Sequence, residues 1–378
     1  MNSPLERFYA CMEYRSADRR PNHELGVWPQ TISRWQAEAP DAVRCFTWNW
    51  FHNEPEIDLD PREYIPVHYG FIPPFPFEML EETDVYEIFR DGLGIVHKAL
   101  KAGTVAGGRM CMDQYLDHPV HDRASFDAVK KRLIAAIPAR YPADLDSRMA
   151  AWAVRDCPLV LGENCAANGF YWRAREFMGT ENLSMAWYDE PEMMHEMMEF
   201  IADFLIETSR PVLDRAPIDY FTFNEDLAAK GGPLLGPHTF REFILPHMRR
   251  VVRFLKEHGV RWVALDSDGD PTVLIPLFME AGIDIIWPIE RASHVSPMEW
   301  RRQFGRDLRL WGGVDKRELA KGPQAIRAHL LEMAPLIEEG GFIPTVDHCV
   351  SPEISWDNFR YYMDAKMDLL SGRFDRLE

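Results

Sequence analysis

Several features that would narrow the function of this chain are absent from its 378 residues. No stretch approaches the roughly 18 consecutive apolar residues that a membrane-spanning helix needs, and no apolar segment follows Met1 as a secretory signal would. The six cysteines show no Cys-x-x-Cys spacing; they are Cys11, Cys45, Cys111, Cys157, Cys165 and Cys349. Scattered thiols are typical of a reducing compartment. We therefore expect a cytoplasmic protein without a membrane span.

Basic residues are in deficit. The chain has 42 Lys and Arg against 60 Asp and Glu, which gives a formal net charge of −18. This charge repels nucleic acid and anionic membranes, and it offers no array of cations whose contacts with phosphates would release counterions. The charge balance therefore argues against a nucleic-acid partner.

Common nucleotide-binding and hydrolase motifs are also missing. The sequence has no Gly-x-x-x-x-Gly-Lys loop, no Gly-x-Ser-x-Gly elbow and no Gly-x-Gly-x-x-Gly after a strand. The segment Asp266–Asp270 superficially resembles a calcium loop, but its glycine stands at the fourth rather than the sixth position, and Leu277 occupies the twelfth. An EF-hand is therefore excluded.

From about residue 157 onward, short apolar runs alternate with longer amphipathic stretches. Apolar runs of four or five residues that do not alternate suit a parallel sheet covered on both faces. Six strand-and-helix units are visible, with strands at 158–161, 220–223, 261–265, 284–287, 308–311 and 342–345. This number of units favours a closed (β/α)8 TIM barrel over an open sheet. We expect residues 1–378 to form one such α/β domain.

The first 150 residues are less regular, and the first two barrel units must lie among them. Residues 86–89 and 95–98 flank the turn sequence Asp91–Gly94. This arrangement predicts a β-hairpin inserted into the barrel. The rest of the N-terminal segment is expected to be irregular.

Polar side chains follow the predicted strands. Residues two apart on a strand face the same way, so Asp266 and Asp268 are able to point at one ligand, with a nitrogen from His348 if the barrel brings its loop alongside. Active sites of such barrels lie at these strand ends. The strand-end residues are Glu163, Asn164, Asn224, Glu225, Asp226, Asp266, Asp268, Glu290, Asp315, Lys316, Asp347 and His348. Crowded carboxylates repel unless they are protonated or bound to a cation, so the set implies raised pKa values or a metal ion.

Some of these residues also have a simpler explanation. Taken singly, Asp226 and Asp315 are suited to cap the helix that follows each strand. Cys349 is adjacent to His348, and neighbouring residues on an extended segment point to opposite faces. We therefore interpret Cys349 as a structural thiol rather than a nucleophile.

The order and spacing of three segments resemble the uroporphyrinogen decarboxylase superfamily. They are the loop 265–270, the segment Gly312–Lys316, and the stretch from Gly340 through Asp347 and His348 to Pro352. The resemblance extends from Pro4–Phe8 to Asn358–Phe359 and is strongest between about 218 and 360. It implies a (β/α)8 barrel with its pocket at the C-terminal mouth.

Two chemistries occur in that superfamily. The decarboxylases carry an arginine-rich N-terminal segment that holds the acidic side chains of the tetrapyrrole; here that segment reads Leu25–Gln30 and has no arginine. Only His348 falls on a residue expected in the decarboxylase pocket. In the methyltransferase branch, a His-x-Cys pair and a distant Cys hold zinc, and these positions fall on Asp266, Asp268 and His348. Because oxygen ligands also admit harder divalent ions, zinc is the expected metal but not the required one.

The resemblance therefore implies a methyltransferase that acts as the demethylase component of a corrinoid system. A divalent metal on the three ligands would act as a Lewis acid on a small methoxy or methylamine-type methyl donor, and the corrinoid would belong to a separate partner protein. The other assigned residues are Glu225 as fourth ligand or base, Glu290, Asp226 and Lys316 for orientation or proton delivery, and Trp28, Tyr171, Trp172 and Trp287 as an aromatic wall. A homodimer would also be typical of what the resemblance implies.

Two other functional classes stay open. In a metal-free lyase, Asp266 or Asp268 would protonate the carbanion left by decarboxylation of a pyrrole or aromatic acid, with His348 as partner. A barrel that binds a ligand without catalysis is the second class, because a fold alone does not establish function. The density of strand-end carboxylates argues against that class.

Overall fold

The structure is a computed structural model that describes residues 1–43, 57–162 and 168–376. A parallel seven-stranded sheet forms its centre, in the order β1-β6-β7-β10-β11-β12-β13. Its strands are β1 (Glu63–Tyr64), β6 (Leu159–Leu161), β7 (Tyr220–Asn224), β10 (Trp262–Asp266), β11 (Ile285–Trp287), β12 (Arg309–Trp311) and β13 (Phe342–Ile343). The last six coincide with the six predicted strands, which confirms the α/β class.

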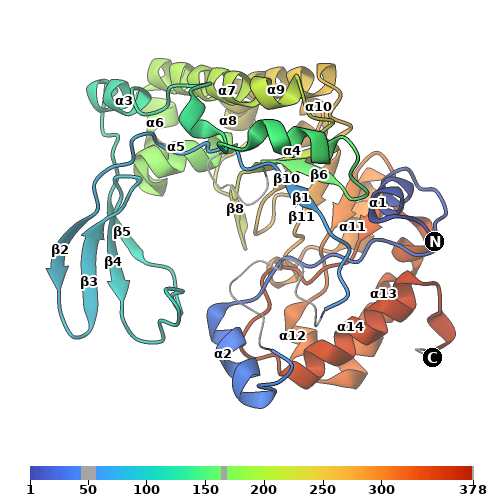
Figure 1. Ribbon diagram of the computed structural model, residues 1–378. Helices are drawn as coiled ribbons and strands as arrows, with labels where there is room; N and C mark the ends of the chain where they lie inside the picture. The colour runs from blue at the N-terminus through green and yellow to red at the C-terminus, as the bar shows by residue number, and fades with distance from the viewer. Residues whose placement is uncertain (44–56, 163–167, 377–378) are drawn as a thin grey trace.

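Helices connect and cover these strands (Figure 1). They are α1 (Pro4–Met12), α2 (Pro29–Glu38), α3 (Arg123–Lys130), α4 (Leu145–Trp152), α5 (Phe170–Met178), α6 (Thr180–Asp189), α7 (Pro191–Leu213), α8 (Pro237–Thr239), α9 (Leu245–Glu257), α10 (Ile275–Ala281), α11 (Pro297–Phe304), α12 (Lys316–Leu319), α13 (Pro323–Glu339) and α14 (Trp356–Leu370). Shorter pieces are the 3-10 turns Pro138–Arg140, Arg291–Ser293 and Phe374–Arg376, the π-helical turn Phe240–Ile244, and the small pair β8 (Ala228–Ala229) and β9 (Gly232–Pro233). No helix in the described part of the chain is long and apolar enough to cross a membrane.

Within the described residues the sheet is curved and has seven strands, so closure into a barrel of eight strands stays a prediction. The gap between β13 and β1 is spanned by residues 22–28. On one side the Asp60 N–H donates to the Asn22 carbonyl at 2.8 Å, and on the other the Val350 N–H donates to the Gly26 carbonyl at 2.9 Å. These isolated hydrogen bonds hold the segment in place without the regular ladder that defines a strand.

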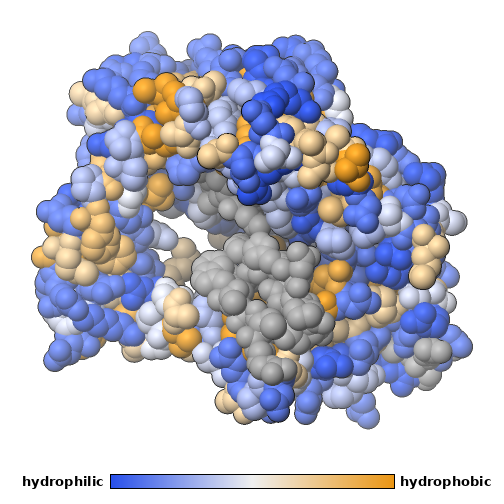
Figure 2. Space-filling model, viewed as in Figure 1, coloured by the Kyte–Doolittle hydropathy of each residue, from blue (hydrophilic) through white to orange (hydrophobic). Residues whose placement is uncertain are grey.

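The predicted hairpin region is larger than expected. Strands β3 (Tyr86–Arg90) and β4 (Val96–Leu100) pair antiparallel, as the turn between them predicts. They form the middle of a four-stranded sheet whose outer strands are β2 (Glu78–Glu82) and β5 (Gln114–Asp117). Figure 1 shows this sheet standing to one side of the helices, and Figure 2 shows apolar residues on its surface. Its large exposed hydrophobic residues include Phe77, Met79, Leu80, Val85 and Tyr115.

Aromatic side chains fill the inside of the curved sheet. Phe8 from α1 stacks on Tyr220 at 5.3 Å between ring centroids and meets the Trp262 ring edge-on at 5.5 Å. Trp287 and Trp311 belong to the same buried cluster. Helix α1 therefore packs against the inside of the sheet, and we expect polar side chains at the ends of the strands.

A buried ion pair ties the N-terminal segment to the last long helix. Lys366 on α14 and Glu24 are both fully buried, and their Nζ and Oε1 atoms are 2.5 Å apart. The Tyr362 hydroxyl donates to the same Glu24 oxygen at 2.5 Å, and the Val346 N–H donates to the other at 2.9 Å. Breaking a buried pair by removing one partner costs about 3–5 kcal/mol. This contact therefore anchors residues 22–28 beside the strand end of β13.

Candidate functional site

Two of the predicted ligand residues meet at the mouth of the sheet. Asp268 lies in the loop after β10 and His348 in the loop after β13. The Asp268 Oδ2 and His348 Nε2 atoms are 3.3 Å apart, and the two side chains are 36% and 29% exposed. The parent strands are three positions apart in the sheet order. Only a strongly curved sheet brings such loops together, and the partial exposure gives a ligand access to both groups.

The surroundings of Asp268 and His348 favour the ionised form of both groups. Burial lowers the pKa of His348, but the hydrogen bonds and charges of Asp268 and Cys349 outweigh burial and raise it well above its usual value. Burial raises the pKa of Asp268, while His348, Lys316 and Arg175 together lower it below its usual value. The contact is therefore a charge-assisted hydrogen bond between two reactive groups.

A second ion pair joins the loop after β7 to helix α5. The Asp226 Oδ2 atom lies 2.7 Å from an Arg175 guanidinium nitrogen. Burial, followed by the charge of Asp268, raises the pKa of Asp226 against the opposing effect of Arg175. Asp226 has a φ of 39°, in the left-handed region that costs a non-glycine residue energy. Such strain is found at functional sites, and here it presents the carboxylate toward Asp268 and Arg175.

The predicted residues Glu290 and Lys316 form a third, looser pair. Lys316 Nζ lies 3.9 Å from Glu290 Oε1. The other Glu290 oxygen accepts hydrogen bonds from the Gly269 N–H at 3.1 Å and the Ser293 hydroxyl at 3.3 Å. Glu290 therefore joins the loops that follow β10 and β11, next to Asp268.

These three pairs answer the question that the crowded carboxylates raised. Asp226, Asp268 and Glu290 each have a cationic partner from the chain itself. These cations offset part of the mutual repulsion, and the rest contributes to the raised pKa of Asp226, as the crowding predicted.

The buried carboxylate of Asp347 positions the loops of this site. It is fully buried, and it accepts hydrogen bonds from the Arg291 N–H at 2.9 Å and the Lys316 N–H at 3.2 Å. Burial raises the pKa of Asp347 to about 6. The residue is the neighbour of His348, so one short segment fixes both the histidine and the backbone of Lys316.

Glu225 lies beside the site but faces a helix terminus. Its fully buried carboxylate accepts hydrogen bonds from the Phe170 and Tyr171 N–H groups at 2.8 and 2.7 Å, which caps the start of α5. Burial raises its pKa to about 7 against the effect of these hydrogen bonds. Gly169 permits this approach, because a Cβ there would lie 1.8 Å from the Asn224 carbonyl oxygen. The carboxylate therefore fixes α5, which carries Arg175.

The four aromatic residues of the predicted wall lie in different places. Trp28 precedes α2, where its N–H donates to the Val350 carbonyl at 3.2 Å. Tyr171 is 1% exposed, and Trp287 belongs to the aromatic cluster inside the sheet. Trp172 is half-buried and lines a cavity. The structure does not gather the four into one wall; Trp172 alone among them borders the cavity beside helix α5.

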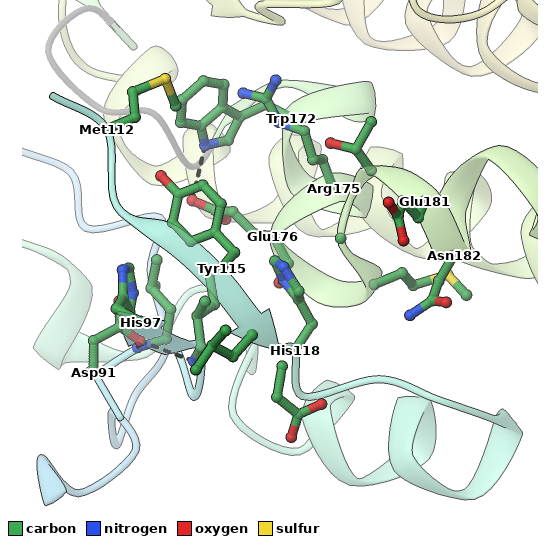
Figure 3. Close-up of a pocket in the computed structure, with 17 residues that line it drawn as sticks. Asp91, His97, Met112, Tyr115, His118, Trp172, Arg175, Glu176, Glu181 and Asn182 are labelled. Carbon is green, nitrogen blue, oxygen red and sulfur yellow. Dashed lines mark hydrogen bonds and ion pairs between the residues drawn. The ribbon is translucent and has the colours of Figure 1, made fainter. Parts of the chain in front are cut away.

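That cavity lies between the four-stranded sheet and helices α5 and α6, and its volume is about 440 Å³ (Figure 3). Its lining residues are Asp91, Leu93, Ile95, His97, Met112, Tyr115, Leu116, Asp117, His118, Trp172, Arg175, Glu176, Met178, Gly179, Thr180, Glu181 and Asn182. Arg175 belongs to this lining and pairs with Asp226. The cavity is therefore next to the strand-end site.

The donors brought together do not fit the predicted three-ligand metal centre. Across the described ranges, no three His, Cys, Asp or Glu side chains are grouped to hold one ion. The 3.3 Å separation of Asp268 and His348 does match two ligands about 2.0–2.2 Å from one tetrahedral ion, but catalytic zinc takes three protein ligands. The Asp266 carboxylate does not complete such a group. The metal centre stays a prediction, and no step proposed below depends on it.

Sequence reasoning missed one residue of the site, gave another no role, and named two that lie outside the described residues. Arg175 sits within a helix, without a motif to mark it; its signal is the spacing Trp172-x-x-Arg175, which places both on one helix face. Asp347 was noted at a strand end without a role. Glu163 and Asn164 fall in the segment that the structure does not describe.

Comparison with known proteins identifies the family. The profile of the uroporphyrinogen decarboxylase (URO-D) family matches residues 174–368, just over half of the chain. The chain belongs to the URO-D family. The matched region contains Arg175, Asp226, Asp268, Lys316 and His348, so the strand-end site lies within the part that the family shares.

Curated relatives of this URO-D protein include two kinds of enzyme. A uroporphyrinogen decarboxylase from Crocosphaera subtropica is 28% identical over 48% of this chain and 49% of its own length. A methylated-thiol–coenzyme M methyltransferase from Methanosarcina mazei is 25% identical over 54% of this chain and 53% of its own. The chain spans about half the length of the curated relatives it matches.

A solved structure resembles nearly the whole URO-D chain. A methyltransferase from Methanosarcina mazei superposes with a TM-score of 0.58 at 15% identity, over 97% of this chain and 99% of its own. At that identity the similarity establishes the fold. The superfamily resemblance that the sequence indicated is confirmed by the family profile over residues 174–368.

Proposed function

We propose that this chain is the substrate-side methyltransferase of a corrinoid system. It removes a methyl group from a small methoxy or methylamine-type donor, and the corrinoid on a separate protein would supply the methyl-accepting centre. The observation that carries the proposal is the contact of Asp268 and His348 at the mouth, with Nε2 and Oδ2 3.3 Å apart. Support also comes from the methyltransferase among the relatives.

Methyl transfer from a methoxy donor makes one demand that the pair meets. The carbon–oxygen bond breaks with its electron pair left on oxygen, and this oxygen must take up a proton. The proton held between His348 and Asp268 is placed to move to it, so the pair acts as general acid. An amine donor that binds as an ammonium ion leaves as a neutral amine and needs no such proton.

The neighbouring ion pairs orient this acid. Arg175 and Lys316 both lower the pKa of Asp268 by their charge. They keep it anionic, so the carboxylate holds His348 protonated and in place. Glu290 and Asp226 in turn fix the two cations.

The test is methyl transfer to free cob(I)alamin, followed by its absorbance, with a panel of methoxy and methylamine donors. His348→Gln should lower the rate with methoxy donors by about 10²–10⁴-fold, the usual contribution of a general acid. His258→Gln is a matched control, because His258 forms a similar pair with Asp214 at 3.4 Å on the helical layer. Equal rates for the His348 variant and the parent would contradict the assignment.

Decarboxylation of a pyrrole or aromatic acid is the second candidate. Lys316 favours it, because its loose 3.9 Å pair with Glu290 leaves the ammonium group able to hold a substrate carboxylate. Opposing it is the segment Leu25–Gln30, which lacks the arginines that would hold a tetrapyrrole. Release of labelled CO2 from such acids, without methylcobalamin from any donor, would decide for the lyase.

A further inference from the structure

The cavity beside Trp172 has a composition that selects one class of ligand. Its volume of about 440 Å³ lies within the range of small-molecule sites. The aromatic and thioether side chains in its lining are Met112, Tyr115, Trp172 and Met178. Figure 3 shows the Trp172 indole nitrogen hydrogen-bonded to Glu176, with Tyr115 in the same lining. These rings come from α5 and β5, so the cavity exists only because the four-stranded sheet lies against α5.

The charge of the lining is strongly acidic. Four acidic side chains line the cavity, Asp91, Asp117, Glu176 and Glu181, against one arginine, Arg175, and two histidines, His97 and His118. Arg175 is already committed, because it pairs with Asp226 at 2.7 Å. The cavity therefore disfavours anions and favours a cation.

Two of the carboxylates are held by other groups, and two remain near solvent. The Asp91 carboxylate meets His97 Nε2 at 3.1 Å, and Glu176 accepts hydrogen bonds from Trp172 Nε1 at 2.8 Å and Arg173 at 2.9 Å. These contacts hold the indole of Trp172 in a fixed orientation. Asp117 and Glu181 are both exposed, and Asp117 lies 3.4 Å from His121 Nε2. The charge of Glu181 is therefore the one placed to meet an incoming ligand.

The Trp172 ring already shows an affinity for positive charge. The Arg175 guanidinium carbon lies 4.4 Å from its centroid. The negative face of an aromatic ring attracts cations, and rings next to carboxylates are the usual receptor for methylated ammonium groups.

We propose that this cavity binds a methylated ammonium ion, which is the methyl donor of the proposed reaction. The role of this ion as methyl donor rests on the proposed function. The binding site itself does not, because it follows from the rings and charges of the cavity. The ammonium group lies against Trp172 and Tyr115, and the carboxylates balance its charge. Arg175 links this site to Asp226 and the strand-end pair.

The experiment is calorimetric titration of the full chain with choline and, as a neutral isostere, 3,3-dimethylbutan-1-ol. Choline should bind and the alcohol should not. Trp172→Leu should weaken choline binding by about tenfold, which corresponds to ~1.4 kcal/mol for a cation–π contact. Glu181→Gln should weaken it by about threefold through lost charge attraction, since ~0.6 kcal/mol is typical of an exposed charge pair.

Glu299→Gln is the matched control, because Glu181 and Glu299 both lie exposed in the first turn of a helix. Equal affinity for the two ligands, no choline binding, or Trp172→Leu and Glu181→Gln variants that bind like the parent would each overturn the site. Choline binding as expected, without methyl transfer from any donor, would keep the site and refute the proposed function. Methyl transfer from methoxy donors in a protein that does not bind choline would refute the ammonium site and keep the proposed function.

Discussion

Replacing Glu225 by glutamine should change how stability depends on pH. Glu225 is fully buried, and burial raises its pKa to about 7 from an ordinary value of 4.5. Between these two values the folded state keeps a proton that the unfolded state releases. The contribution of Glu225 to stability is therefore complete below about pH 4.5 and is lost as the pH rises to about 7. Glutamine keeps the size and one acceptor oxygen but cannot ionise.

The magnitude follows from the size of the pKa change. The pKa of Glu225 differs by about 2.5 between the folded and unfolded states, and each pKa unit corresponds to ~1.4 kcal/mol. The contribution of Glu225 to the free energy of unfolding is therefore about 3 kcal/mol. The stability of the parent minus that of Glu225→Gln should fall by this amount between pH 4.5 and 7 and stay level above pH 7. Urea unfolding followed by circular dichroism at four pH values measures it.

The exposed Glu299→Gln variant serves as the control and should show a level difference at all four pH values. A difference that stays level or increases with pH for Glu225→Gln would refute the reasoning. It would mean that the N–H groups of Phe170 and Tyr171 hold the carboxylate ionised despite its burial. The same variant should retain most of its methyl-transfer activity, because Glu225 caps a helix and does not touch the donor.

Three further outcomes follow from the geometry. Gly169→Ala should lower the free energy of unfolding by about 1–3 kcal/mol or more, because the added carbon would lie 1.8 Å from a backbone oxygen. A lower melting temperature would show this loss. Lys366→Met should cost about 3–5 kcal/mol in urea unfolding, since it leaves a fully buried carboxylate without its cation. After chelation and reloading with zinc, any retained metal should depend on Asp268 and His348 and be unaffected by Asp266→Asn. Elemental analysis measures the retained zinc. Loss of zinc in Asp266→Asn would support the predicted three-ligand centre.

The sequence predicted the regular part of the fold well because that part is governed by local pattern. Six apolar runs became six neighbouring parallel strands, and turn residues identified the hairpin of β3 and β4. The closing segment 22–28 escaped prediction because its place depends on long-range contacts, above all the buried pair of Glu24 and Lys366. No local periodicity encodes a contact of that kind.

The candidate site was predictable to a similar degree. Asp268 and His348 lie together, as the strand-end positions indicated, although their role as ligands stays a prediction. Glu225 follows a strand in the same way but turns to the start of α5. A strand-end position alone does not say which way a side chain turns. Arg175 was not predicted, because an arginine within a helix gives little indication of a functional role until the fold places its partner Asp226 beside it.

The most direct test of the account uses a methyl donor labelled with three deuterium atoms. The protein is incubated with cob(I)alamin and either labelled trimethylammonium or a labelled methoxybenzene, and methylcobalamin is analysed by mass spectrometry. We expect labelled methylcobalamin, with transfer from the methoxy donor lost in His348→Gln and kept in His258→Gln. Absence of labelled methylcobalamin with every donor, together with CO2 release from an aromatic acid, would contradict the assignment as a methyltransferase.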